Sequence, residues 1–194
     1  MIEEMRNNDG VSFKHVLDID SFTRSDIELV LENTSAMEEV LNRNIKKVPA
    51  LRGKTIVTLF YEPSTRTRVS FETGFFRLGG HALFLGPDDI GIGKRESIAD
   101  VAQVLSRYND MIMARLFDHS HILEMAKHAT VPVVNGLTDF NHPCQIMADI
   151  LTILEHRGNL DDLKIAYVGD GNNIVHSWLA LAMRIPMQFT IACP

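Results

Sequence analysis

The chain has 194 residues, 45% of them hydrophobic and 23% charged, which is the composition of a soluble globular protein with room for one domain and part of a second. A formal net charge of −6 at pH 7 argues against a nucleic-acid partner, because nucleic-acid phosphates call for a basic face. No apolar run approaches the roughly 20 residues of a membrane span, so no membrane partner is expected.

The N-terminus predicts no targeting segment. Residues 1–10 are acidic and lack the apolar core of a secretory peptide, and they do not have the character of a transit peptide. Cys144 and Cys193 form no plausible disulfide framework, which fits a reducing compartment. We therefore expect a cytoplasmic protein, or the processed form of a protein from an organelle matrix or stroma.

Short apolar runs alternate with amphipathic stretches along the chain, after an N-terminal arm at residues 1–12 that is expected to be frayed. The first amphipathic stretch begins at a capping residue, Thr23 or Ser25, and residues 86–95 form a polar, glycine-bearing loop that is long for a simple connection. Helices are predicted at about 25–42, 65–78, 98–109, 121–129, 143–156 and 173–184, and strands at 55–60, 81–85, 111–114, 131–135, 163–169 and 188–192.

Strands separated by helices on this rhythm indicate parallel β-α-β units. The predicted fold class is α/β: a doubly wound parallel sheet flanked by helices, plus the start of a second α/β domain. In open parallel sheets, ligands bind beyond the carboxyl ends of the strands. The loops after Phe60, Ala114, Asn135 and Gly169 begin at such ends, so their side chains are expected to meet in one crevice.

The strand at 55–60 leads into a cluster of polar groups, Ser64-Thr65-Arg66-Thr67-Arg68, at the start of a helix. Free backbone N–H groups and the positive end of the helix dipole favour a phosphate or carboxylate at such a turn. Ordinary capping is the alternative interpretation. Capping needs one hydroxyl, however, and does not explain two cations at the helix end where the dipole disfavours them.

Arg115 directly follows an apolar strand, and in isolation it would be interpreted as a solvent-exposed charge at the edge of the sheet. At the same sheet edge as Arg66 and Arg68, it becomes a third cation aimed at the crevice. The favoured interpretation is therefore a functional arginine.

His142 and Gln145 flank the start of the helix at 143–156. The structural alternative makes His142 a capping residue and Cys144 a small core residue. The favoured interpretation is a histidine and an amide donor that polarise a carbonyl or carboxyl oxygen. A metal site is not predicted, because His142 and Cys144 lack a second ligand pair at zinc-finger spacing.

Residues 169–173, Gly-Asp-Gly-Asn-Asn, imitate a dinucleotide-binding turn after a strand. Ile174 stands where the third glycine or alanine belongs, and the acidic ribose ligand about 20 residues further on is missing. A nucleotide-dependent oxidoreductase is therefore a weak alternative. A P-loop is disfavoured as well, because Val48 occupies its first glycine position.

Together, these segments resemble the aspartate/ornithine carbamoyltransferase family from about residue 15 to the end, and its ornithine branch more closely. The aspartate branch generally has threonine where Cys144 stands and lacks the pair Asn172-Asn173. The resemblance rests on Ser64-Thr65-Arg66-Thr67-Arg68, Val-Leu-Ser-Arg at 104–107, Met-Ala-Arg ending at Arg115, Gly-Leu-Thr-Asp at 136–139, His142-Pro143-Cys144-Gln145 and Gly169-Asp170-Gly171-Asn172-Asn173.

The resemblance implies a carbamoyl-phosphate-binding domain at 1–156 and the incomplete start of an ornithine-binding domain at 157–194. It implies transfer of the carbamoyl group from carbamoyl phosphate to the δ-amine of ornithine without a metal, an organic cofactor or a covalent intermediate, so that Cys144 is not a nucleophile. Catalytic roles are implied for Arg66, Arg115 and His142. Substrate binding is implied for Ser64, Thr65, Arg66 and Thr67 (phosphate), Arg115, His142 and Gln145 (carbamoyl group) and Asn173 (ornithine backbone).

The family is typically trimeric, or a multiple of trimers, and a loop of one subunit completes its neighbour's site. Residues 86–95 correspond to that loop. Gly91 stands where relatives often carry glutamine, while Lys94 and Arg95 offer charge to a neighbour. Three alternatives stay open: a carbamoyltransferase for aspartate, one for an acylated ornithine, and a non-catalytic fragment that binds carbamoyl phosphate, because a single β-α-β unit after residue 157 cannot cover both faces of its strands.

Overall fold

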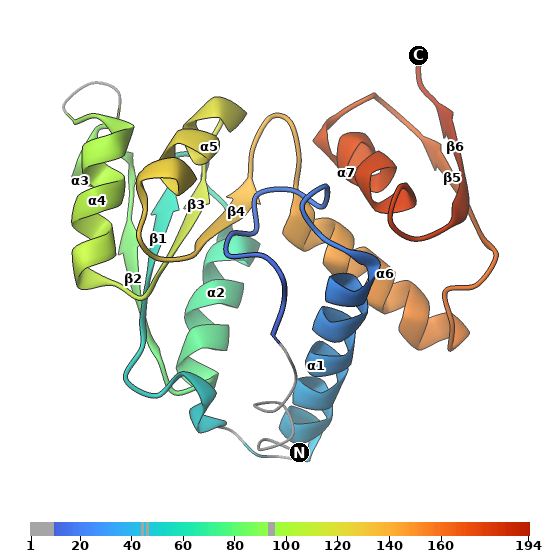
Figure 1. Cartoon of the computed structure of the whole chain (residues 1–194), viewed down its shortest axis with the longest axis horizontal. Helices are drawn as coiled ribbons and strands as arrows, with labels where there is room; N and C mark the ends of the chain where they lie inside the picture. The colour runs from blue at the N-terminus through green and yellow to red at the C-terminus, as the bar shows by residue number, and fades with distance from the viewer. Residues whose placement is uncertain (1–9, 44, 46, 93–95) are drawn as a thin grey trace.

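Two parallel sheets organise the described part of the chain, which comprises residues 10–43, 45, 47–92 and 96–194 of the computed structural model (Figure 1). The larger sheet has the strand order β2-β1-β3-β4, and the smaller pairs β5 with β6. This arrangement confirms the predicted α/β class. The strands are β1 (Thr55–Phe60), β2 (His81–Leu85), β3 (Met111–Arg115), β4 (Val133–Leu137), β5 (Leu163–Val168) and β6 (Met187–Ala192).

Helices cover both faces of the four-stranded sheet, because successive side chains of a strand point to opposite faces. Val57 and Leu59 of β1 are buried against α4 and α5, whereas Ile56 packs with Phe75 of α2 on the other face. None of the described helices combines the length and hydropathy that a bilayer crossing requires. The α-helices are α1 (Arg24–Asn42), α2 (Thr65–Arg77), α3 (Pro87–Ile90), α4 (Ile98–Tyr108), α5 (His119–His128), α6 (Pro143–Arg157) and α7 (Asn173–Ala182), and a 3₁₀ turn, η2, spans Pro49–Leu51.

A second hydrophobic core lies between α1, α6 and the lobe formed by β5, α7 and β6. Figure 1 shows α6 running from the end of β4 towards the lobe formed by β5, α7 and β6. Ile146 and Ile150 of α6 are fully buried between Ile27 of α1 and Trp178 and Leu181 of α7. Because α6 contributes to this shared core, its N-terminal end is held against both lobes.

The N-terminal arm is anchored at Ser12. Its backbone N–H and its Oγ donate to the two carboxylate oxygens of Asp26, at 2.7 and 2.6 Å. Asp26 also accepts hydrogen bonds from Thr23, the residue that caps α1. Burial alone raises the pKa of Asp26, but these hydrogen bonds lower it well below its usual range. The prediction of a frayed arm is therefore wrong at Ser12, and residues 1–9 lie outside the described part.

β4 differs most from its predicted bounds of 131–135. Pro132 has no N–H to give to the ladder, and only its carbonyl takes part, accepting from Ile112 N at 2.9 Å. At the other end the chain continues as a strand through Gly136, where an added Cβ would lie 2.6 Å from Met113 Sδ. The close approach of β3 and β4 thus explains the glycine, and the loop begins after Leu137 rather than after Asn135.

The predictions for the loop at 86–95 and for the helix at 121–129 also need correction. Pro87–Ile90 forms a helical turn, α3, inside the segment predicted to be a loop, and Asp89 accepts from the Gly86 N–H at its start. Lys94 and Arg95 lie outside the described residues. The helix predicted at 121–129 begins earlier, at His119, because the Asp118 side chain caps it.

Candidate functional site

The carboxyl ends of β1, β3 and β4 lie side by side. Phe60 pairs with Arg115, and Arg115 pairs with Leu137. Backbone hydrogen bonds continue past the strand ends, from Tyr61 N to Arg115 O at 3.0 Å and from Leu116 N to Leu137 O at 3.1 Å. The loops that carry the predicted residues therefore meet at one edge of the sheet.

The first turn of α2 uses one hydroxyl for capping. Ser64 Oγ accepts from Thr67 N at 3.3 Å and donates to Thr67 Oγ1 at 3.0 Å. Thr65 and Arg66 are exposed, and in the described part of the chain no hydrogen bond or ion pair holds the Arg66 guanidinium. The turn thus keeps the Thr65 hydroxyl, the Arg66 guanidinium and the backbone N–H groups of Thr65 and Arg66 available for an anion, whereas the Thr67 N–H is taken by Ser64.

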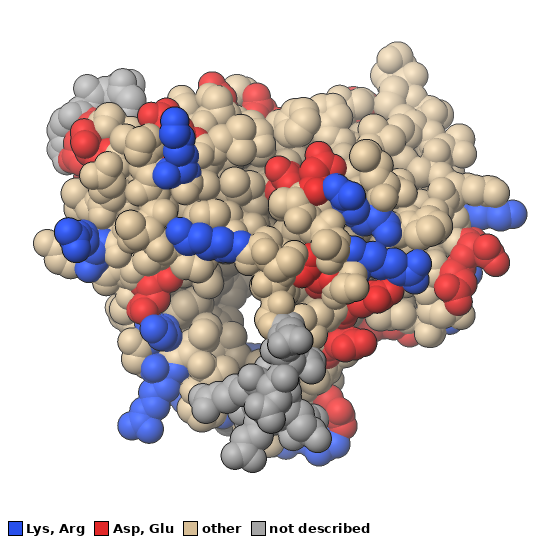
Figure 2. Space-filling model, viewed as in Figure 1, with Lys and Arg blue, Asp and Glu red and all other residues tan. Residues whose placement is uncertain are grey.

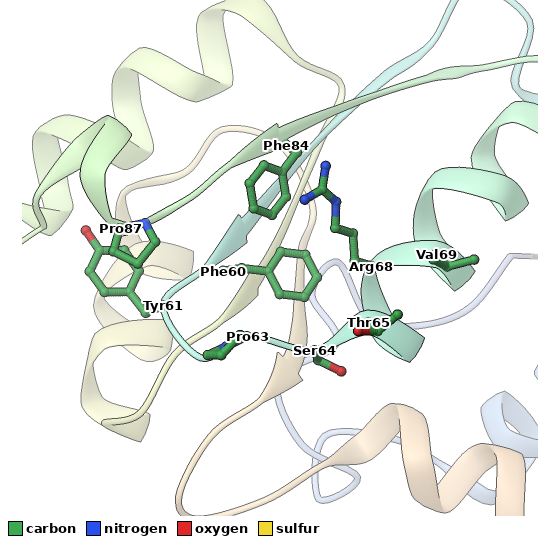
Figure 3. Close-up of a pocket in the computed structure, with 9 residues that line it drawn as sticks. All are labelled: Phe60, Tyr61, Pro63, Ser64, Thr65, Arg68, Val69, Phe84 and Pro87. Carbon is green, nitrogen blue, oxygen red and sulfur yellow. The ribbon is translucent and has the colours of Figure 1, made fainter.

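Arg68 is occupied. Its Nε donates to Glu72 at 2.8 Å, and its guanidinium carbon lies 3.6 Å from the centre of the Phe84 ring. Sequence reasoning missed this stack, because Phe84 comes from β2 and only the pairing of β1 with β2 brings it to α2. A hollow of about 450 Å³ lies between the start of α2 and the rings of Phe60, Tyr61 and Phe84. Figure 3 shows its lining residues, which are Phe60, Tyr61, Pro63, Ser64, Thr65, Arg68, Val69, Phe84 and Pro87.

Arg115 is half-buried at the end of β3. Its Nη1 donates to Gly136 O over 3.5 Å, and its buried Nε has no partner among the described residues. Burial lowers the pKa of Arg115, while the charge of Glu62 raises it. A partly desolvated guanidinium with unfilled donors is expected to gain from an anionic or carbonyl ligand. Basic and acidic side chains are interspersed over the described surface seen in Figure 2, so that face of the molecule carries no extended basic patch.

His142 lies at the N-terminal end of α6. Its backbone N–H donates to Ser177 Oγ at 2.8 Å, whereas its buried Nδ1 has no partner among the described residues. Burial, and then the positive charge of Arg115, lower the pKa of His142 to about 4. The ring is therefore neutral at pH 7, and it lies within electrostatic reach of Arg115.

Gln145 and Asn173 are both engaged. Gln145 is exposed, and its Nε2 donates to Asp149 Oδ1 one turn along α6, at 2.8 Å. Asn173 Nδ2 donates to Thr138 O at 2.8 Å, which brings the start of α7 to the loop between β4 and α6. The structure thus groups Asn173, His142 and Arg115, while no hydrogen bond or ion pair links the described Arg66 side chain to them.

Sequence reasoning also missed a cluster of three rings at this loop. Phe140 lies between His119 and His176 in tilted contacts, with centroid distances of 5.2 and 5.0 Å. Nδ1 of His119 is 2.9 Å from Thr138 Oγ1, and Nδ1 of His176 is 2.8 Å from Phe140 O. The residues come from separate elements, so no spacing in the sequence could have signalled the cluster.

Cys144 is expected to be unreactive. Burial raises its pKa to about 11, and its Sγ donates to Asn135 O over 3.5 Å. Because the thiolate is the nucleophile, iodoacetamide at pH 8 should label the exposed Cys193 and spare Cys144. Cys144→Ser should change ligand affinity by less than about threefold, since a hydroxyl can donate to the same carbonyl. Rapid labelling of Cys144, read by peptide mass spectrometry, contradicts this expectation.

The neutral state of His142 gives stability a defined pH dependence. The unfolded histidine takes up a proton near pH 6.5, but the folded one does so only near pH 4. Stability should therefore fall as the pH drops from about 6.5 to about 4, by about 3 kcal/mol in total, and this contribution should be flat above pH 6.5. His142→Asn should flatten this segment in urea unfolding, whereas the exposed control His81→Asn should not. Parallel curves for wild type and His142→Asn would count against the assignment.

Comparison with known proteins gives a consistent result. The carbamoyl-P binding domain of the aspartate/ornithine carbamoyltransferases matches residues 14–155, and their Asp/Orn binding domain matches residues 161–194. The chloroplastic ornithine carbamoyltransferase of Pisum sativum is 55% identical over 185 residues, 95% of this chain and 49% of its own length. The chain thus spans about half the length of that curated relative.

Solved structures give the same picture. Ornithine carbamoyltransferase from Pyrococcus furiosus superposes with a TM-score of 0.89 at 45% identity, over 93% of this chain and 57% of its own. The catalytic subunit of M. jannaschii aspartate transcarbamoylase superposes with a TM-score of 0.83 at 33% identity, over 94% of this chain and 59% of its own.

Proposed function

Because the chain belongs to the aspartate/ornithine carbamoyltransferase family, we propose that it transfers the carbamoyl group of carbamoyl phosphate to the δ-amine of ornithine, giving citrulline and phosphate. The observation that carries the proposal is the meeting of three strand ends, which gathers the α2 turn, Arg115 and the His142 loop at one edge of the sheet. In this assignment residues 1–156 bind carbamoyl phosphate, and residues 157–194 begin the part that binds ornithine.

The phosphate is assigned to the first turn of α2. Ser64, Thr65, Arg66 and Thr67 offer hydroxyls, a guanidinium and the N–H groups that a helix leaves free at its start. Ser64 and Thr67 already bond to each other, so ligand binding would exchange that contact for bonds to phosphate oxygens.

The carbamoyl group is assigned to Arg115, His142 and Gln145. The Arg115 guanidinium donates to the carbonyl oxygen. The His142 ring is neutral, so it donates through a single N–H and adds no positive charge. Gln145 would first turn away from Asp149 to reach the carbamoyl amide. Asn173 is assigned to the backbone of ornithine, next to the loop that its side chain already contacts.

The chemistry follows from these donors. The neutral δ-amine attacks the carbonyl carbon, the carbonyl oxygen gains negative charge, and the tetrahedral species collapses as the carbon–oxygen bond to phosphate breaks. The electron pair of the broken bond leaves with the phosphate, and the proton that the nitrogen loses passes to a phosphate oxygen, so that the phosphate departs as a dianion. Preorganised donors at such an oxygen are typically worth about 3–4 kcal/mol each. Arg115 and the α2 turn thus stabilise the developing oxyanion and the departing dianion.

Ornithine is the proposed acceptor because Cys144 and Asn172-Asn173 match the ornithine branch of the family. The relatives from Pisum sativum and Pyrococcus furiosus are ornithine carbamoyltransferases by name. A homotrimer, in which residues 86–95 of one subunit complete the neighbouring site, and a place in arginine biosynthesis in the cytoplasm are parts of the same proposal. Residues 86–92 of that loop are described, and residues 93–95, which include Lys94 and Arg95, lie outside the described residues.

Calorimetric titration with carbamoyl phosphate tests the proposal, followed by an analogue that joins ornithine to a phosphonate. We expect saturable binding of carbamoyl phosphate and tighter binding of the joined analogue, with citrulline formation measured in parallel. An analogue built on aspartate should bind more weakly. Absence of carbamoyl-phosphate binding refutes the proposal, and NADH fluorescence enhancement in the same preparation would point to the oxidoreductase instead.

A further inference from the structure

Asn135 is the centre of a buried hydrogen-bond network beside the candidate site. Its side chain is fully buried in β4, two residues before the strand ends at Leu137. Nδ2 donates to Leu17 O at 2.9 Å and to Asn141 Oδ1 at 2.6 Å, and Oδ1 accepts from Leu137 N at 2.9 Å. A buried amide that is satisfied on both ends holds its partners in one arrangement.

These partners bracket the loop of residues 137–141. Leu137 has a φ of 152°, a region that non-glycine residues seldom occupy and that surrounding contacts must maintain. At the other end, Asn141 O accepts from Thr138 N at 3.0 Å, and Asn141 N donates to Thr138 Oγ1 at 3.3 Å. The Asn135 amide therefore fixes both ends of a compact loop.

His142 directly follows this loop. Its buried Nδ1 has no partner among the described residues, so no hydrogen bond at that nitrogen orients the ring. The direction of the ring must then come from packing and from the backbone that enters α6. Besides the loop, that backbone is held by Ser177, whose Oγ accepts from His142 N.

We propose that Asn135 is a positioning residue for the proposed reaction: its amide holds the backbone of residues 137–141 and thereby aims the His142 ring towards Arg115. The chemical consequence rests on the proposed function, in which His142 acts on the carbamoyl oxygen. The geometric consequence is independent of the proposed function, because the orientation and burial of His142 can be measured without substrate.

The test compares Asn135→Ala with Thr58→Val. Thr58 is a matched control, since it is fully buried in the same sheet and its Oγ1 donates to Leu83 O at 3.0 Å, on the side of β1 away from β3. Both variants should lower the midpoint of thermal unfolding, Asn135→Ala by more, because it removes three side-chain hydrogen bonds and Thr58→Val removes one. Only Asn135→Ala should move the imidazole titration of His142, followed by NMR, from about 4 towards the ordinary value near 6.5.

A double-mutant cycle with His142→Ala supplies the second readout. In the wild-type and Thr58→Val backgrounds, His142→Ala should weaken carbamoyl-phosphate binding by about tenfold, the size of one lost hydrogen bond to a charged ligand. In the Asn135→Ala background the same change should cost less than about threefold. Equal losses in all three backgrounds overturn the proposal.

Failure of the proposed function can be distinguished from failure of the positioning role of Asn135. If the wild-type protein binds no carbamoyl phosphate, the proposed function fails, and the NMR titration still decides the role of Asn135. A His142 titration that is the same in Asn135→Ala and Thr58→Val overturns that role even if binding is normal. Should Asn135→Ala not fold, Asn141→Ala removes the bond between the two amides without adding a charge and leaves the Asn135 bonds to Leu17 and Leu137 in place, and the shift of the His142 titration should have the same direction.

Discussion

Replacing Arg115 by methionine should weaken carbamoyl-phosphate binding by roughly 100- to 1,000-fold while leaving the protein at least as stable as before. The guanidinium is half-buried, its one contact to Gly136 O spans 3.5 Å, and its Nε has no partner among the described residues. The folded protein thus bears the cost of desolvating a charge that Glu62 offsets only in part and that an anionic ligand would compensate further. Methionine keeps an unbranched apolar side chain in place of the arginine stem and removes that charge.

Calorimetry and thermal unfolding of the same preparation measure the two effects. A loss of affinity together with a fall in the unfolding midpoint would mean that Arg115 is structural, which contradicts the assignment. Arg107→Met, on the exposed surface of α4, is a suitable control and should change neither quantity. Binding that survives Arg115→Met would remove the residue from the site.

Arg66→Ala should weaken carbamoyl-phosphate binding by about 100-fold and leave the fold intact. A charge-assisted bond to a phosphate is worth about 1.5–3 kcal/mol, and a bidentate guanidinium makes two. The exposed side chain has no partner in the described structure, so its removal breaks no contact. The stability of α2 should stay the same or rise slightly, because a cation at a helix N-terminus opposes the dipole.

Arg68→Ala provides the contrast within the same helix. It removes an equal charge two residues further on, but the Arg68 guanidinium is already held by Glu72 and stacked on Phe84. We expect a loss of affinity below about tenfold, together with a small loss of stability. Equal effects of the two substitutions on phosphate affinity would show that the turn acts only through net charge, against the assignment of Arg66.

Much of the fold could be predicted from local patterns. Thr55–Phe60 is a short apolar run bounded by turn residues, and the capping residue Ser97 marks the start of α4, so both elements were placed correctly. Errors arose where tertiary contacts override local signals. β4 extends to Leu137 because Leu137 pairs with Arg115 of β3, a pairing that depends on the neighbouring strand.

The sequence by itself determined the residue types at the strand ends and the parallel β-α-β order, because periodicity and capping act over a few neighbouring residues. Only the tertiary structure decided which groups are free to bind. It engages Arg68 with Phe84, and it leaves Arg115 and His142 each with a buried nitrogen that no described residue partners. It also hydrogen-bonds Asn135 to Asn141, in the loop before His142. Burial and long-range hydrogen bonds cause these differences, and both depend on which strands and helices lie side by side.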